Sequence, residues 1–405
     1  MKQGWEIKRL EDAVEFQRGL TYSKKDEVDF SDNIVLRSNN VDLIKNELDF
    51  TELKYINPAI EVQENKKVKK GSLLICTANG SKSHLGKVAL IDDDYNYAFG
   101  GFMGQVTPKE KLDSKFLFYL MTSDNYKKFI NELSDGANIN NLKFSDLGQF
   151  EIPLPPLPEQ QLIVTILDEA FAAIAKAKAN AEQNLKNAKE LFESYLQGVF
   201  EKKGDGWEET TLGEIAFVKS GGTPLRHKTE YWSGNIAWYS SGELNNLYTT
   251  NPERHINELA IENSNAKLFP KGSLLIGMYD TAALKMSILD RDGTFNQAIA
   301  GVKPNPKIDL IFILHAINAI KPEILNLRRG VRQKNLSLEK IKNIPISLPP
   351  LKEQQTIVRQ LDALRAETQK LEAVYQKKID DLEELKKSIL QKAFAGELKT
   401  SQEVV

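Results

Sequence analysis

"IPLPPLPEQQLIV" (Ile152–Val164) and "ISLPPLKEQQTIV" (Ile346–Val358) are two nearly identical stretches of one chain of 405 residues, separated by an offset of 194 residues. Each stretch passes from Leu-Pro-Pro-Leu into Glu-Gln-Gln, and no glycine or proline then follows until Gly198 in the first copy and Gly396 in the second. Proline is tolerated in a first helical turn, and glutamate suits the positive helix N-terminus. Each stretch therefore predicts the start of one long helix.

The similarity extends over most of the chain. Three further pairs of segments match in the same order. They are Gly-Trp-Glu at residues 4–6 and 206–208, "KGSLLI" at 70–75 and 271–276, and "FGGFMGQVTP" at 99–108 with "FNQAIAGVKP" at 295–304. The offset falls from 202 residues at the first pair to 194 at the proline clusters, so the first copy is slightly longer. The chain is a tandem duplication.

Composition limits the class of protein. A chain of 405 residues exceeds the size of one usual core, and 41% apolar residues are ample for globular domains. No apolar run approaches the roughly 18–20 residues of a membrane span, and the N-terminus lacks a signal-peptide core, so we expect a cytoplasmic protein without membrane contact. The single cysteine, Cys76, lies in an apolar run and predicts a buried structural thiol. A net charge of −2 argues neither for nor against nucleic-acid binding.

Each copy combines two kinds of sequence. Short β-rich apolar runs, turn residues and one apolar helical stretch predict α+β domains over residues 1–157 and 205–350. Spacer helices are predicted over residues 158–204 and 351–405, the second with a C-terminal tail, and about 40 helical residues span about 60 Å. The fold class is thus α+β, with two globular domains in a tandem pseudo-twofold repeat joined by two long antiparallel coiled-coil helices.

The apolar positions of the two helices predict what they contact. Spacings of three and four predict a buried seam between the helices. Its predicted members are Leu162, Ile166, Ala170, Ile174, Ala177, Ala181, Leu185, Ala188, Phe192, Tyr195 and Val199 in the first helix. In the second helix they are Ile357, Leu361, Leu364, Thr368, Leu371, Tyr375, Lys378, Leu382, Leu385 and Ile389, where Thr368 and Lys378 break the apolar pattern. Pairing of the two helices with each other is favoured, since both seams are equally long. The alternative is that each helix packs on its own domain.

Two diverged domains, each followed by a Pro-Pro-Leu-x-Glu-Gln-Gln helix, with "LKKSILQKAFAGEL" (385–398) closing the second, resemble the specificity subunit of type I restriction-modification systems. The resemblance covers essentially the whole chain. It implies that the globular parts are target recognition domains, each reading one half of a bipartite site in double-stranded DNA. It further implies that the helices set the spacing between the half-sites.

The resemblance also implies partners. Two methyltransferase subunits would dock on the helices, and restriction (translocase-nuclease) subunits would join that core, on DNA inside a bacterial or archaeal cell. S-adenosylmethionine, ATP and Mg would bind in these partner subunits, and no cofactor is expected in this chain.

The sequence offers no convincing enzyme site. "FGGFMG" (99–104) lacks the glycine spacing and the companion tetrapeptide of an S-adenosylmethionine site, and "GSKSHLGKV" (80–88) has the wrong spacing for a phosphate loop. The four histidines lie far apart without companions at metal-ligand spacing. We therefore expect a non-catalytic chain without a metal site. A coiled-coil scaffold with protein-binding heads and an unrecognised enzyme remain the alternatives.

Polar loops at equivalent places in both copies are the candidates for DNA contact, because Arg and Lys bind phosphate or guanine and Asn and Gln pair with adenine. They follow the Gly19 and Gly221 turns, follow "GSLLI", and precede the last strand of each domain. The densest cluster holds four cations within residues 328–334. The predicted contacts are Thr21, Tyr22, Lys24, Asn79, Ser81, Lys82, Asn138, Asn140 and Lys143 in copy one, and Thr223, Arg226, Lys228, Tyr279, Lys285, Arg328, Arg329, Arg332, Gln333 and Asn335 in copy two.

Overall fold

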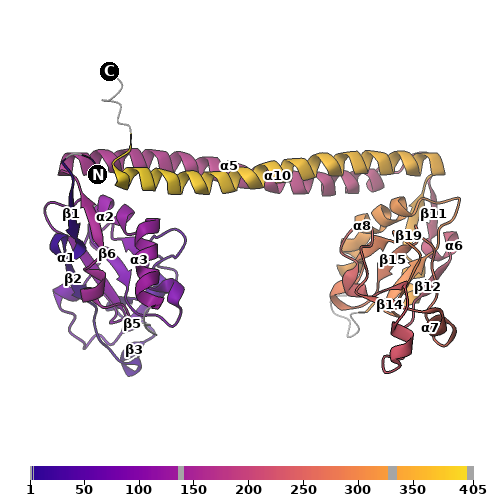
Figure 1. Ribbon diagram of the computed structural model, residues 1–405, viewed down its shortest axis with the longest axis horizontal. Coiled ribbons are helices and arrows are strands. Elements are labelled where there is room, and N and C mark those ends of the chain that lie inside the picture. The colour runs from indigo at the N-terminus through magenta and orange to yellow at the C-terminus, as the bar shows by residue number, and fades with distance from the viewer. Residues whose placement is uncertain (1, 3, 136–140, 327–334, 399–405) are drawn as a thin grey trace, which may run out of the picture. The chain divides into compact units, whose positions relative to one another are not determined.

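The computed structural model describes residues 2, 4–135, 141–326 and 335–398. The chain divides into two compact units, Met1–Ala181 with Lys377–Val405 (unit 1) and Glu182–Gln376 (unit 2). Each unit contains one globular domain and one half of each of two long helices, α5 (Leu157–Glu201) and α10 (Leu351–Ala395) (Figure 1). Domain 1 is the part of unit 1 that precedes α5, and domain 2 is the part of unit 2 between α5 and α10.

Domain 1 is built on three sheets. A strand pair joins β1 (Glu6–Arg9) to β10 (Glu151–Leu154). One four-stranded sheet has the order β2 (Val14–Arg18), β9 (Met103–Pro108), β6 (Leu73–Cys76), β7 (Val88–Leu90), and the other β3 (Glu27–Val28), β5 (Lys54–Ile56), β4 (Ile34–Leu36), β8 (Ala98–Phe99). The helices are α1 (Leu10–Ala13), α2 (Ser114–Leu120), α3 (Asp124–Asp135) and α4 (Phe144–Leu147), with 3-10 turns at Lys24–Asp26, Ser38–Asn40, Glu64–Lys66 and Lys82–His84.

Domain 2 repeats this plan. The strand pair joins β11 (Glu208–Thr211) to β19 (Pro345–Leu348). The four-stranded sheet has the order β12 (Val218–Ser220), β18 (Ile299–Val302), β15 (Leu274–Gly277), β16 (Met286–Ile288). The three-stranded sheet has the order β14 (Arg254–Ile256), β13 (Ile236–Tyr239), β17 (Gly293–Phe295). The helices are α6 (Leu212–Ile215), α7 (Glu258–Glu262), α8 (Leu310–Asn326) and α9 (Leu338–Lys342), with 3-10 turns at Thr229–Trp232, Ser241–Glu243 and Asp280–Ala282. The predicted α+β class and tandem repeat are confirmed.

The first glutamine of each Glu-Gln-Gln sequence fixes the start of its helix. Gln160 is fully buried; its Oε1 accepts from Asp113 N at 2.8 Å, and its Nε2 donates to Pro155 O at 2.8 Å and Lys111 O at 2.9 Å. In domain 2, Gln354 Oε1 accepts from Asp309 N and Gln354 Nε2 donates to Pro349 O, both at 2.8 Å. The repeated sequence is therefore a clamp that joins the helix start to the domain.

The helix starts pack on the domains. Ile163, Val164 and Leu167 belong to the core of domain 1, and α10 makes the equivalent contact with domain 2. Part of the predicted seam is buried, including Ile174, Ala181, Ala188 and Phe192 of α5 and Ile357 and Leu361 of α10. The prediction is wrong for Leu162, Tyr195, Leu371 and Leu385, whose side chains are 40–47% exposed. The alternative, in which each helix packs on its own domain, holds for the first turns of α5 and α10. There the domain covers the helix, so the buried face of α5 is the one that carries Ile163, Val164 and Leu167 and not Leu162.

Beyond these first turns, the halves of α5 and α10 lie side by side in each unit (Figure 1). In unit 1, Lys386 Nζ lies 5.2 Å from the ring centroid of Phe171; in unit 2, Arg365 Cζ lies 4.5 Å from that of Phe192. At the offset of 194 residues, Phe171 is equivalent to Arg365, and Phe192 is equivalent to Lys386. Both contacts therefore join the same two equivalent positions of the repeat, and in both α5 supplies the ring and α10 the cation. The pairing in unit 1 is antiparallel, since Lys178, further along α5, bonds to Glu383, which lies earlier in α10. Cation–aromatic contacts are among the stronger surface interactions.

In the described part of the chain, no helix is both long enough and apolar enough to cross a lipid bilayer. Cys76 is fully buried, as predicted.

His315 on α8 occupies an unusual position in domain 2. Its ring is 1% exposed, and neither nitrogen has a hydrogen-bond partner among the described residues. Burial next to the Arg365 cation lowers its pKa to about 4. Counted from Asp113 and Asp309, the equivalent residue of domain 1 is Tyr119, whose hydroxyl donates to Asp168. The repeat places Asp362 where Asp168 stands, and burial raises the pKa of Asp362.

We expect His315→Tyr to stabilise domain 2 and to reduce its acid sensitivity. The new hydroxyl can donate to Asp362, a bond worth about 1 kcal/mol. In the original protein the unfolded chain binds a proton at His315 below pH about 6.5 and the folded chain does not until pH about 4, so stability falls as pH falls between these values, by up to about 1.4 kcal/mol per pH unit. Urea unfolding at pH 7 and pH 5 measures both effects. The exposed-site control His227→Tyr should keep the original slope, and an unchanged slope in His315→Tyr would refute the assignment.

Candidate nucleic-acid interface

A glycine turn brings distant loops together at the same place in both domains. A Cβ on Gly19 would lie 2.0 Å from Gly100 O, and one on Gly221 would lie 2.0 Å from Phe295 O. Only glycine permits this backbone approach. The loop after β2 therefore lies directly against the turn that follows β8, and the loop after β12 against the turn that follows β17.

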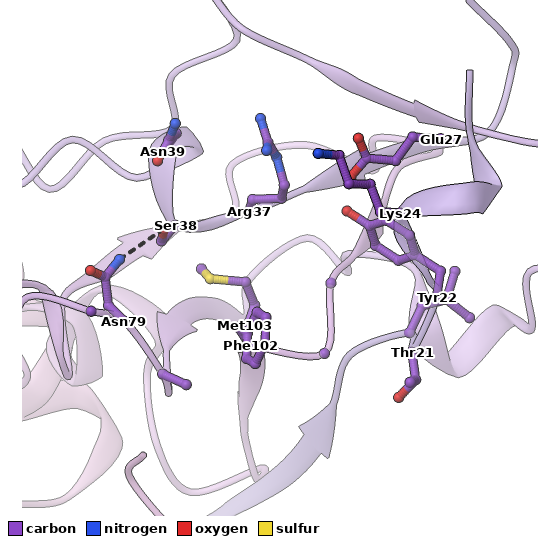
Figure 2. A pocket seen from close by; sticks show the side chains of 15 residues that line it. Thr21, Tyr22, Lys24, Glu27, Arg37, Ser38, Asn39, Asn79, Phe102 and Met103 are labelled. Carbon is purple, nitrogen blue, oxygen red and sulfur yellow. Dashed lines mark hydrogen bonds between the residues drawn. The ribbon is translucent and has the colours of Figure 1, made fainter. Parts of the chain in front are cut away.

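Beside this crossing, domain 1 has an open cavity of about 700 Å³, called cavity 1 (Figure 2). It is lined by segments from four parts of the chain. The lining residues are Leu20, Thr21, Tyr22, Lys24, Glu27, Arg37, Ser38, Asn39, Ala78, Asn79, Gly80, Gly100, Gly101, Phe102 and Met103. Its volume and mixed lining are those of a ligand site rather than of a packing defect.

The polar groups of cavity 1 differ in how they are engaged. Asn79 Nδ2 donates to Ser38 Oγ at 3.0 Å, and Asn79 Oδ1 accepts from Ser81 N at 2.9 Å. Glu27 forms an ion pair with Lys54 at 2.7 Å, and the hydrogen bond from Lys54 lowers the pKa of the Glu27 carboxyl. Arg37 Nε is buried and has no hydrogen-bond partner in the described structure.

An exposed aromatic ring stands at the edge of cavity 1. Phe102 is 74% exposed, although its carbonyl oxygen is held by Thr77 N, Ala78 N and Thr77 Oγ1 at 2.9–3.1 Å. Burial raises the pKa of the nearby Tyr22 phenol, which keeps it protonated as a donor. An exposed ring on a hydrogen-bonded turn, next to polar donors, suits contact with bases or sugars.

The structure brings together some of the contacts predicted for domain 1. Thr21, Tyr22, Lys24 and Asn79 all line cavity 1. Ser81 and Lys82 follow Asn79 in an exposed 3-10 turn, where Lys82 Nζ donates to Ser134 O at 3.4 Å, and neither lines the cavity. Lys143 is exposed before α4, outside the lining. Asn138 and Asn140 lie outside the described residues, although the next residue, Asn141, pairs with Ala78 of the lining.

Several residues that line cavity 1 were not among the predicted contacts. These are Glu27, Arg37, Ser38, Asn39 and Phe102. A signal was present for three of them, because Arg-Ser-Asn directly follows the apolar strand "IVL". Such a polar run at a strand end is typical of a binding loop.

Domain 2 has a cavity of about 590 Å³ on its own glycine turn, called cavity 2. Its lining residues are Val218, Lys219, Ser220, Gly221, Gly222, Thr223, Asn265, Lys267, Gln297, Leu338 and Lys342. Three are lysines and none is acidic, whereas cavity 1 includes Glu27. Within the lining of cavity 2, Thr223 Oγ1 donates a hydrogen bond to Gln297 Oε1. Clustered lysines, hydroxyls and amides suit a phosphate anion.

Of the contacts predicted for domain 2, Thr223 is the one described residue that lines cavity 2. Arg226 is exposed, and Tyr279 is 37% exposed. Lys228 Nζ lies 3.4 Å from Tyr231 Oη, and Lys285 Nζ donates to Asn245 Oδ1 at 2.9 Å, so both lysines have partners within the domain.

The loop before the last strand returns to the same region of domain 2. Exposed Asn335 lies next to Leu336, whose N–H donates to Met278 O directly before Tyr279. Arg328, Arg329, Arg332 and Gln333 lie outside the described residues, and their role stays a prediction. Among the residues that the structure describes, no cluster of three His, Cys, Asp or Glu side chains could hold a metal ion.

Comparison with known proteins bears directly on these paired sites. The sequence profile of one family, described as "Type I restriction modification DNA specificity domain", matches residues 2–186 and again residues 204–383. The chain belongs to this family. The resemblance drawn from the repeated helix signatures is thereby confirmed, and the two matches coincide with the two copies of the repeat.

Relatives in this family match along nearly the whole chain. The EcoKI specificity subunit of Escherichia coli K12 is 27% identical over 98% of this chain and 90% of its own length. The specificity subunit of StySPI from Salmonella potsdam is 26% identical over the same shares. The putative MjaX specificity subunit of Methanocaldococcus jannaschii is 26% identical over 98% of this chain and 94% of its own.

Solved structures of type I systems share the fold. One is a chain from a study of complex assembly and conformational transition of the type I R-M system. It has a TM-score of 0.80 at 20% identity and covers 98% of this chain and 99% of its own length. The HsdS subunit of Thermoanaerobacter tengcongensis has a TM-score of 0.68 at 19% identity, covering 98% of both chains. The tandem architecture with two long helices is thus the architecture of specificity subunits.

Proposed function

We propose that this chain is the DNA-specificity subunit of a type I restriction-modification complex, in which domain 1 and domain 2 each read one half of a bipartite double-stranded DNA site. The observation that carries the proposal is the glycine crossing built twice, at Gly19 and Gly221, with a polar cavity beside each copy. The shared backbone would place each domain on DNA in the same way. The different linings would read different bases.

The chemistry of cavity 2 supports contact with nucleic acid. Lys219, Lys267 and Lys342 gather on one surface of a chain whose overall charge is −2. Such local gathering of cations is the footprint of phosphate binding. A scaffold with protein-binding heads, the other candidate, gives no reason for a lysine-lined cavity without a carboxylate.

The proposed role is non-catalytic. S-adenosylmethionine, ATP and Mg would bind in partner subunits, namely two methyltransferase subunits and the restriction subunits. Docking of the methyltransferases on the helices is supported by exposed apolar side chains along them. These include Leu191, Val374 and Leu385, which are 47–60% exposed. A bound partner subunit would cover such exposed apolar side chains.

A charge-removal experiment tests the proposal. In the complex with methyltransferase subunits, Lys219→Ala combined with Lys267→Ala should weaken binding to all duplexes alike and reduce the slope of log affinity against log salt by about 2, since each lost phosphate contact removes about 1. Fluorescence anisotropy over a salt series measures both. The control Lys307→Ala removes an exposed lysine outside cavity 2. An unchanged salt slope in the double variant, or an equal change in the control, would contradict the phosphate role.

A further inference from the structure

We propose that cavity 1 reads one G·C base pair in the major groove, with the Arg37 guanidinium donating to guanine O6 and N7 and the Glu27 carboxylate accepting from the cytosine N4 amine. The inference rests on the proposed function and adds to it the base pair that domain 1 requires at one position of its half-site.

Arg37 is placed as a donor that lacks an acceptor. Its backbone N–H is fixed by Asn40 Oδ1 at 2.8 Å at the end of β4, and its side chain reaches into cavity 1 (Figure 2). Arg37 Nε is buried without a hydrogen-bond partner in the described structure. A buried donor without a partner is costly, and a guanidinium has only donors. A ligand that supplies acceptors would satisfy this nitrogen, and guanine presents two acceptors side by side, matching the guanidinium fork.

Glu27 restricts the ligand further. Its side chain is 26% exposed, faces the same cavity, and stays ionised because the Lys54 hydrogen bond lowers its pKa. One oxygen of the Glu27 carboxylate is paired with Lys54 Nζ, and the carboxylate can accept a further hydrogen bond from a donor at the DNA surface. In the major groove the cytosine N4 amine is such a donor, directly beside the guanine that Arg37 reads.

The side chains of cavity 1 suit hydrogen bonds with an adenine less well than with a guanine. Adenine is read by an amide that offers a free N–H and a free oxygen together. Asn79 has both ends engaged, by Ser38 Oγ and Ser81 N. Asn39 is exposed at the rim, where it can meet a neighbouring base.

The repeat limits this reading to domain 1. The parallel pairing of Leu36 with Phe99 corresponds to that of Tyr239 with Phe295, so Ser240 stands where Arg37 stands in domain 1. Among the described residues of domain 2, no acidic side chain lines cavity 2. The two domains thus share a framework and differ at the positions that would select a base.

The test uses the complex with methyltransferase subunits and a panel of duplexes in which each base pair of the recognised site is replaced in turn. The original complex should lose about 10- to 100-fold in affinity when one particular G·C pair of one half-site is replaced. Arg37→Ala should remove that discrimination at that position alone. Glu27→Ala should weaken it at the same position. Lys25→Ala, an exposed residue outside the lining, is the matched control and should change no position.

Arg37→Lys keeps the charge and loses the fork, so it should relax the same position while affinity for unrelated DNA is retained. This variant keeps the test decisive if Arg37→Ala fails to fold. Discrimination kept at every position by both Arg37 variants, or lost equally at all positions, overturns the G·C assignment. An original complex without any sequence preference would overturn the proposed function itself, which separates the two failures.

Discussion

Replacing Gln160 with alanine is expected to lower the free energy of unfolding by about 2–4 kcal/mol, because several buried backbone groups lose their partner at about 1–3 kcal/mol each. Gln160 has no exposed surface and bonds to Asp113 N, Pro155 O and Lys111 O. Water cannot readily replace it at these groups. Urea-induced unfolding of the original and variant chains, followed by circular dichroism, measures the difference.

The adjacent glutamine provides the matched control. Gln161 is exposed, so Gln161→Ala should change the unfolding free energy by less than about 0.5 kcal/mol. In domain 2, Gln354→Ala should be costly and Gln355→Ala neutral for the same reason. Similar losses for both members of a pair would show that the clamp is not what fixes the helix start.

Inserting four residues after Asn184 in α5 is expected to change the preferred spacing between the two half-sites while both half-site sequences are retained. The insertion adds about one turn, or about 6 Å, to a helix that contributes to both units, and 6 Å corresponds to about two base pairs of B-DNA. The cavity residues are untouched. The spacing preferred by the methyltransferase complex is measured with duplexes whose unread gap varies one base pair at a time.

A length-neutral variant separates spacing from disturbance of the helix surface. Asn184→Ala should keep the original gap, and thermal unfolding must show that the insertion variant is folded before its spacing is read. A folded insertion variant that keeps the original gap would mean that the helices do not set the distance between half-sites.

Internal repetition made much of the fold predictable. The duplicated proline and glutamine signature predicted long helices at 158–204 and 351–405, and the structure has them at Leu157–Glu201 and Leu351–Ala395. Comparing equivalent loops also located part of cavity 1, because Thr21, Lys24 and Asn79 occupy positions that both copies keep polar. Repeats help because the common backbone is visible twice, while the residues that differ mark the surface.

Other features depend on contacts between residues far apart in the sequence. The polar run after "IVL" indicates a loop at Arg37, but the parallel pairing of β4 with β8, more than 60 residues later, is not visible in that local pattern. The Gln160 clamp depends on the N–H of Asp113. The seam was misplaced at Leu162 because helical periodicity shows that one face is apolar but cannot show which neighbour covers it.

The most direct test of the central claim, that two domains read two halves of one site, is methylation sequencing of a host genome that carries this chain and its partner subunits. We predict adenine methylation within one gapped motif with two specific parts, absent when this chain is deleted. Exchanging residues 1–157 for those of a related chain should replace one part of the motif and leave the other unchanged. A continuous motif, a motif that survives deletion of the chain, or a change in both parts after the exchange would contradict the account.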